Sequence, residues 1–145
     1  MTQTTVMTDE TTHPFTGVHV PTTLHLREPL PGLPGHTEFD VTSLDDIGVL
    51  HAIRSVPAAG AQPVRLFVVV PQPFFPDYAP AISAEAVAAV GGPAERLVLL
   101  VVVHPADGPH PATANLLAPL VVDPVTGAAV QSVVDEDWPL RAPLA

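Results

Sequence analysis

The fold is decided by residues 112–122, ATANLLAPLVV, together with residues 128–134, AAVQSVV. The five residues DPVTG separate these two apolar runs and form a turn signal. Pro124 fixes φ at the second turn position, Asp123 can accept backbone hydrogen bonds, and Gly127 tolerates a positive φ. The stretch therefore predicts a β-hairpin with a loop of about five residues.

Two carboxamides, Asn115 and Gln131, interrupt the apolar runs of this hairpin. A buried carboxamide is costly unless its donors and acceptors are matched. We therefore expect both side chains to bond to neighbouring backbone and to hold the hairpin together. Contact with a partner is the alternative for each of them.

Length and composition favour one β-rich domain. The chain has 145 residues, enough for one domain with a core and too few for two. Its 47% hydrophobic content excludes a wholly disordered chain. Its 19 prolines exclude a helical bundle and suit short strands joined by turns.

The charge balance narrows the classes of partner. The chain has no lysine, five arginines and a formal net charge of -10. Direct binding of nucleic acid or of an anionic membrane needs basic surface, so we expect neither. An acidic protein favours basic partners instead.

Several features predict a soluble, cytoplasmic protein. The chain has no cysteine, which excludes disulfides and thiolate zinc sites. Its first residues are threonine-rich and acidic, unlike a secretory signal peptide. The longest apolar run, residues 97–103, is too short to span a bilayer.

The order of patterns along the chain predicts a tail followed by a domain. Residues 1–16 are polar and aperiodic, so we expect a disordered tail, with the domain covering 17–145. Proline and glycine in 29–35 predict a rigid double turn. Alternating residues predict short outer strands, at 18–20, 23–26, 37–42 and 47–53.

Two runs without alternation, 64–70 and 97–103, predict central strands that are buried on both faces. We expect Phe67, Leu99 and Val101 to lie in the core.

One helix is expected, over residues 83–90. Ser83 is a suitable N-cap, Glu85 lies in the first turn, and Gly91-Gly92 provides the stop. One short helix among many short strands predicts a mainly β, single-domain antiparallel β-barrel-like fold.

Catalytic signatures are missing from the sequence. No serine lies in a G-x-S-x-G setting, and Gly91-Gly92 has no following lysine. His104, Asp107 and His110 lie close in sequence and allow a three-ligand metal site, although solvated loop histidines are the simpler interpretation. We expect no enzyme activity, no cofactor and no metal.

The segment 71–80, PQPFFPDYAP, is the strongest candidate for a binding surface. Its four prolines stiffen it, which lowers the entropy cost of presenting it to a partner. Phe74, Phe75 and Tyr78 are the residue types that form binding hot spots. The alternative is that Phe74 and Phe75 fold back to plug the open end of a barrel.

Several motifs in this order and spacing resemble the bacterial flagellar assembly factor FliW family. The carrying motifs are Pro31-Gly32-Leu33-Pro34-Gly35, Phe67-Val68-Val69-Val70-Pro71, Phe75-Pro76-Asp77-Tyr78, Thr113-Ala114-Asn115-Leu116, Ala118-Pro119-Leu120-Val121, Gln131 and Pro139-Leu140-Arg141. The chain departs from the family pattern at His36, where an aromatic residue is common, at Asp123, where asparagine is usual, and at Trp138, often tyrosine.

The resemblance implies a non-enzymatic β-barrel protein that binds flagellin in the cytoplasm. Members of the family also bind the RNA-binding translational repressor CsrA. When flagellin is secreted, the released factor sequesters the repressor and flagellin mRNA is translated, which is a competition of two ligands for one protein.

We assign partner binding to three places in the sequence. The residues are Phe74, Phe75, Asp77, Tyr78, Asn115, Asp135, Glu136 and Asp137. For the acidic run 135–137, simple solvated charge is the alternative.

Two other functions stay open. A small-molecule-binding barrel would hold a ligand near His104 and His110, although the solidly Val and Leu central strands argue for a filled core. An oligomeric structural subunit would use Leu116, Leu117 and Leu120 as its contact patch. We expect a monomer.

Overall fold

The computed structural model describes residues 19–57 and 61–144, and it contains short strands and two short helical segments. The expected tail, 1–16, lies outside these residues. The strands are β2 (Thr23–Leu26), β3 (Glu38–Ser43), β4 (Leu50–Ser55), β5 (Arg65–Val69), β6 (Val98–His104), β7 (Thr113–Ala114), β8 (Leu120–Val122), β9 (Ala128–Gln131) and β10 (Ala142–Pro143). The helical segments are α1 (Ala84–Val90) and the 3₁₀ turn η1 (Ala94–Arg96).

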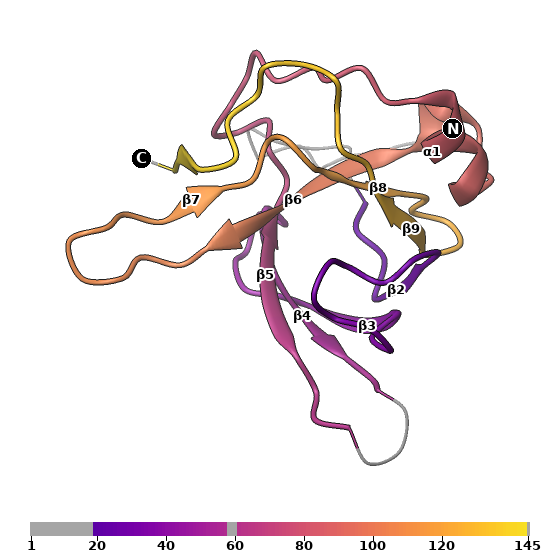
Figure 1. The fold of residues 1–145 in the computed structure, drawn as a ribbon, viewed down its shortest axis with the longest axis horizontal. Coiled ribbons are helices and arrows are strands. Elements are labelled where there is room, and N and C mark those ends of the chain that lie inside the picture. Colours follow the sequence, from indigo (N-terminus) through magenta and orange to yellow (C-terminus); the bar gives the residue numbers. More distant parts are fainter. Residues whose placement is uncertain (1–18, 58–60, 145) are drawn as a thin grey trace, which may run out of the picture.

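Seven of the strands close into a barrel in the order β6, β5, β4, β3, β2, β9, β8, with β8 pairing back onto β6 (Figure 1). Closure removes exposed sheet edges. An odd number of strands cannot alternate in direction all the way round, so one neighbouring pair must be parallel. That pair is β2 and β9, and the other pairings are antiparallel. The predicted mainly β, barrel-like fold is confirmed.

Strand β6 is where the sheet forks. On one edge its residues 101–103 pair with β5. On the other edge, residues 98–100 pair with β8, whereas Val103 and His104 pair with β7. Strand β10 adds to the outer side of β7. Figure 1 shows the β6–β7 hairpin projecting to one side, away from β8 and β9 at the other end of β6.

The fork corrects the expected continuous strand at 112–122. Its two ends, β7 and β8, pair with different parts of β6, so residues 115–119 must leave the sheet between them. The partner strand is also shorter than the expected 128–134. Beyond β9, Ser132 N donates to Pro119 O and Val134 N to Leu117 O, both at 2.9 Å.

The predicted turns of the hairpin and of 29–35 are confirmed. Gly127 has φ +81° at the end of the β8–β9 turn, and an added Cβ would meet Thr23 O at 2.4 Å. In the double turn, Gly32 and Gly35 have φ +79° and +84°. Leu33 N donates to Leu30 O at 2.9 Å. These positions need glycine for their backbone conformation.

Two expected outer strands differ from the structure. Strand β4 begins at Leu50 rather than at 47, because the Asp45 carboxylate accepts from the N–H groups of Gly48, Val49 and Leu50 and holds a turn there. Burial raises the pKa of Asp45, but the three backbone bonds outweigh it and the pKa lies below its ordinary value. Residues 19–20 of the expected strand 18–20 are not in a strand, and Val18 lies outside the described residues.

The central strands separate two cores. Leu100 and Val68 point into the barrel, which is filled by side chains that include Leu24 and Phe39. Val101, on the opposite face of β6, packs in a second, outer core. Burial on both faces is therefore confirmed for these residues, because β6 separates two apolar layers.

Leu99 and Phe67 correct the expected core, since both are only half-buried. They lie on the outer face of the barrel, where cover by other elements is incomplete. The Arg65 guanidinium carbon lies 5.0 Å from the centroid of the Phe67 ring, so a cation covers part of this ring instead of apolar groups.

The predicted helix is confirmed, with both of its caps. Ser83 Oγ accepts from Ala86 N at 3.1 Å. Gly91 has φ +88°, and its N–H donates to Val87 O at 3.0 Å. Ala86 and Val90 pack on the outer face of β8 and β9.

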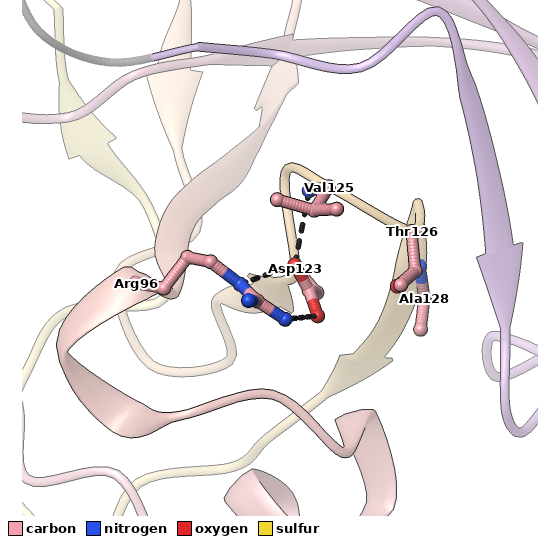
Figure 2. Close-up of polar contacts among 5 residues, drawn as sticks. All are labelled: Arg96, Asp123, Val125, Thr126 and Ala128. Atoms are coloured by element: carbon pink, nitrogen blue, oxygen red, sulfur yellow. Dashed lines mark hydrogen bonds and ion pairs between the residues drawn. The ribbon is translucent and has the colours of Figure 1, made fainter.

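An ion pair between the exposed Arg96 and the buried Asp123 fixes the β8–β9 turn to η1 (Figure 2). Asp123 is 1% exposed, and Arg96 donates to its two oxygens through Nε at 3.0 Å and Nη2 at 2.7 Å. Val125 N also donates to Asp123 Oδ1, at 2.9 Å. The bonds from Arg96 hold the pKa of Asp123 below its ordinary value, although burial opposes them.

Candidate functional site

Tyr78 anchors the candidate surface. Its ring is 3% exposed, and its hydroxyl donates to Leu116 O at 2.6 Å. The rings of Tyr78 and Trp138 pack edge to face, with their centroids 4.8 Å apart. Burial, with a smaller contribution from the Glu136 charge, raises the pKa of Tyr78 to about 12. The phenol is therefore a neutral donor at physiological pH.

The proline-rich loop 71–80 is held in turns by its own backbone. Phe75 N donates to Pro71 O at 2.8 Å, and Tyr78 N donates to Phe75 O at 2.9 Å. This places Phe75 half-buried against the outer core, whereas Phe74 is 42% exposed. Of the three aromatic rings in the loop, Phe74 is therefore the exposed one.

The alternative that Phe74 and Phe75 plug the open end of the barrel is wrong. Phe75 packs against the outer core with Tyr78 and Leu116, and the barrel interior is filled by other residues. Asp77, which lies between Phe75 and Tyr78 in the sequence, is exposed.

The acidic run 135–137 is exposed, and its middle residue bonds to Ala81, directly after the proline-rich loop. Glu136 Oε1 accepts from Ala81 N and from Trp138 Nε1, both at 3.0 Å. Glu136 therefore makes structural contacts, so the alternative of simple solvated charge does not fully describe this residue.

Asn115 and Gln131 form the expected clamp on backbone. Asn115 Oδ1 accepts from Leu117 N at 3.0 Å and from Ala118 N at 3.1 Å. Gln131 Nε2 donates to Ala118 O at 3.2 Å. Both carboxamides thus hold the loop that leaves the sheet at the fork, and the backbone-bonding prediction is confirmed.

The tertiary structure brings most of the predicted residues into one surface, which we call the aromatic–acidic corner. Its members are Phe74, Phe75, Asp77, Tyr78, Asp135, Glu136, Asp137 and Trp138. The Tyr78–Trp138 ring contact and the hydrogen bond from Ala81 N to Glu136 join its two segments, and Tyr78 itself is buried beneath the surface. Asn115 lies next to Leu116, but its side chain lines a different cleft with Gln131.

Trp138 was not among the predicted site residues. The signal that could have found it is its position, because the single tryptophan of the chain directly follows the acidic run.

His104, Asp107 and His110 lie along a separate open cleft of about 430 Å³. The 105–111 loop is closed by paired bonds between the backbones of Asp107 and His110. Within residues 19–57 and 61–144, no group of three or more ligand-type side chains is arranged to hold a metal ion. In the same part of the chain, no helix is long and apolar enough to cross a membrane.

Comparisons with known proteins agree with one another. A family model described as FliW protein matches residues 8–144. A flagellar assembly factor FliW from Heliobacterium modesticaldum is 30% identical over 128 residues, covering 86% of this chain and 82% of the relative. One from Symbiobacterium thermophilum is 31% identical over 115 residues, covering 78% and 82%.

A solved structure supports the fold. The crystal structure of a flagellar assembly factor FliW superposes with a TM-score of 0.72 at 18% identity and covers 89% of each chain.

Proposed function

The chain belongs to the FliW family, and from this membership we propose that it acts as a flagellar assembly factor that binds flagellin in the cytoplasm and antagonises the translational repressor CsrA. Flagellin and repressor then compete for one acidic protein. Secretion of flagellin frees the protein, which sequesters the repressor and restores flagellin translation. The role is that of a binding protein rather than of an enzyme.

The aromatic–acidic corner is the observation that carries this proposal. It combines an exposed aromatic ring, Phe74, with exposed carboxylates on a neighbouring segment. Loop 71–80 is held by its own turns, so docking costs little conformational entropy. An exposed aromatic ring on a stiff loop is suited to be a hot spot, and the carboxylates suit a basic partner.

The acidic run supplies a way to act on RNA without binding it. A repressor must hold the RNA phosphates with arginine and lysine. Three carboxylates docked within about one Debye length of the RNA, roughly 8 Å at physiological salt, repel those phosphates. The repulsion weakens as salt is added.

Displacement of RNA from the purified repressor tests this function. We expect a variant with Asp135→Asn, Glu136→Gln and Asp137→Asn to keep the fold and nearly all of its binding to the repressor. The glutamine that replaces Glu136 retains a side-chain oxygen for Ala81 N and Trp138 Nε1. The variant should displace less RNA at low salt and approach wild type at high salt.

A matched control removes three charges elsewhere, through Asp40→Asn, Asp46→Asn and Glu95→Gln, all at exposed positions. It should displace RNA as the wild type does. If the variant of residues 135–137 displaces as much RNA as wild type at low salt, the acidic run serves solubility only.

Truncation of the exposed ring tests the binding surface. We expect Phe74→Ala to weaken a complex with flagellin or with the repressor by roughly 2 kcal/mol or more, measured by calorimetry. Val125→Ala, at a 71% exposed apolar position outside the corner, is the control and should bind normally. Unchanged binding of both partners by Phe74→Ala would remove this ring from the interface.

A further inference from the structure

The fork at β6 leaves part of the inner sheet face uncovered. Leu100 and Val102 alternate with His104 on the face of β6 that lines the barrel. Along one edge of β6, strand β8 pairs with only the first half. Strand β7 pairs with the second half, where Thr113 lies opposite His104, and so continues the sheet outward. The lining face of the barrel thus runs on to the face of the β7–β10 extension.

Two open clefts on this face meet at His104. The first lies at the mouth of the barrel, has a volume of about 240 Å³ and is lined mainly by apolar side chains, among them Leu33, Leu66 and Val102. The second, of about 430 Å³, lies over the extension. His104 lines both clefts, so the two clefts adjoin at this residue, and we call the pair the fork groove.

The mouth of the groove presents one hydrogen-bond donor and one acceptor. The clamp uses Asn115 Oδ1 and Gln131 Nε2 on the backbone of Ala118 and its neighbour. Among the described residues, Asn115 Nδ2 and Gln131 Oε1 make no hydrogen bond, and both residues line the cleft. A donor and an acceptor held in place match the C=O and N–H of a peptide group.

The other end of the groove lacks the acidic excess of the rest of the molecule. The chain has 15 acidic residues against five arginines. Around the second cleft, however, the ionisable side chains are His104, His110 and Arg141, with Asp107 as the single carboxylate. A guanidinium with two imidazoles favours a carboxylate ligand.

We propose that the fork groove binds an extended segment of a partner polypeptide, with an apolar side chain in the barrel mouth and a carboxylate beside Arg141. The mouth cleft is smaller than most small-molecule sites, which favours a side chain over a cofactor. The segment's backbone bonds to Asn115 and Gln131. This inference extends the proposed function, because it adds a second contact surface to the aromatic–acidic corner.

Short probe peptides test the groove independently of flagellin. Acetyl-Leu-Gly-Asp-amide and its neutral isostere acetyl-Leu-Gly-Asn-amide place both anchoring side chains on one face of an extended chain. Each probe is titrated to millimolar concentration into the isotope-labelled full chain. We expect the acidic probe to shift the side-chain amide signals of Asn115 and Gln131. The neutral probe, and the acidic probe with Arg141→Gln, should bind about five- to tenfold more weakly.

Arg54→Gln is the matched control, since it removes an exposed arginine from β4, a strand that lines neither cleft. It should bind both probes as wild type does. The inference is overturned if the acidic probe leaves the Asn115 and Gln131 signals unmoved, or if Arg141→Gln binds it as tightly as wild type.

Capture of purified flagellin separates this inference from the proposed function. Probe binding without flagellin capture supports the groove and contradicts flagellin as partner. Flagellin capture without probe binding overturns the groove and leaves the proposed function standing.

Discussion

Asn115 holds the loop between β7 and β8 through its carboxamide oxygen. Replacement by alanine leaves Leu117 N and Ala118 N without their acceptor. We expect Asn115→Ala to lower the free energy of unfolding by about 1–3 kcal/mol in urea. Asn115→Asp keeps an acceptor oxygen and should lose less.

Measuring both stability and partner binding of Asn115→Ala separates clamping from partner contact. If Asn115→Ala leaves stability unchanged and reduces partner binding, the side chain is a contact residue and the clamp contributes little.

Tyr78 is the second residue on which the surface depends. We expect Tyr78→Phe to cost about 1–3 kcal/mol, because the carbonyl of Leu116 loses its donor in a buried place. Chemical denaturation measures this cost. A stability equal to wild type would mean that water replaces the hydroxyl.

The raised pKa of Tyr78 predicts how stability changes at alkaline pH. The folded pKa of about 12 exceeds the ordinary value of 10.0, so the unfolded chain ionises first. The contribution is fully present below pH 10 and is lost as pH rises towards 12. Wild type should therefore lose more stability than Tyr78→Phe over this range.

At the scale of elements, the ion pair of Arg96 and Asp123 ties the β8–β9 hairpin to η1. The folded pKa of Asp123 is lowered, so its stabilisation is present above the ordinary carboxyl pKa and is lost as pH falls below it. We expect Asp123→Asn to unfold at a lower temperature than wild type at pH 7. The two should converge in acid.

The exposed Asp77→Asn is the control for this pH profile and should follow wild type throughout. A constant difference between Asp123→Asn and wild type from pH 7 down to pH 2 would show that the charge is not what matters.

Gly92 has no side chain, and this makes room for the ion pair of Arg96 and Asp123. An added Cβ would lie 2.5 Å from Asp123 Oδ2 and 3.0 Å from Arg96 Nη2. We expect Gly92→Ala to lower the melting temperature, because carboxylate and guanidinium must separate. In an Asp123→Ala background the same change should cost little, and equal costs in both backgrounds would contradict this reason.

At the scale of the whole molecule, β6 joins the barrel core to the outer core. Leu100 is fully buried in the barrel, whereas Leu99 is half-buried on the other face. We expect Leu100→Ala to lower the free energy of unfolding, measured in urea, by about 2–5 kcal/mol, and Leu99→Ala to lower it less. A larger cost at Leu99 would contradict the assignment of the two faces.

The shared strand also predicts that the two cores unfold together. Trp138, the single tryptophan, packs against the outer core and reports it by fluorescence, while far-ultraviolet circular dichroism reports all the strands. The two urea transitions should coincide. Separate midpoints would mean that the outer core opens by itself.

Features that depend on near neighbours along the chain could be predicted from the sequence. Ser83 and Gly91 mark the ends of α1, and the DPVTG turn joins β8 to β9, because caps and turns are set by residues within four positions. The apolar runs predicted central strands buried on both faces, and the order of the motifs indicated the FliW family.

Features that depend on distant segments became visible only in the folded chain. The fork at β6 breaks the expected strand 112–122, since β7 and β8 pair with different parts of one edge. Asp123 finds Arg96 27 residues away, and Tyr78 finds Leu116 38 residues away. The aromatic–acidic corner and the fork groove exist because barrel closure brings such segments together, and periodicity along the chain carries no information about which segments will meet.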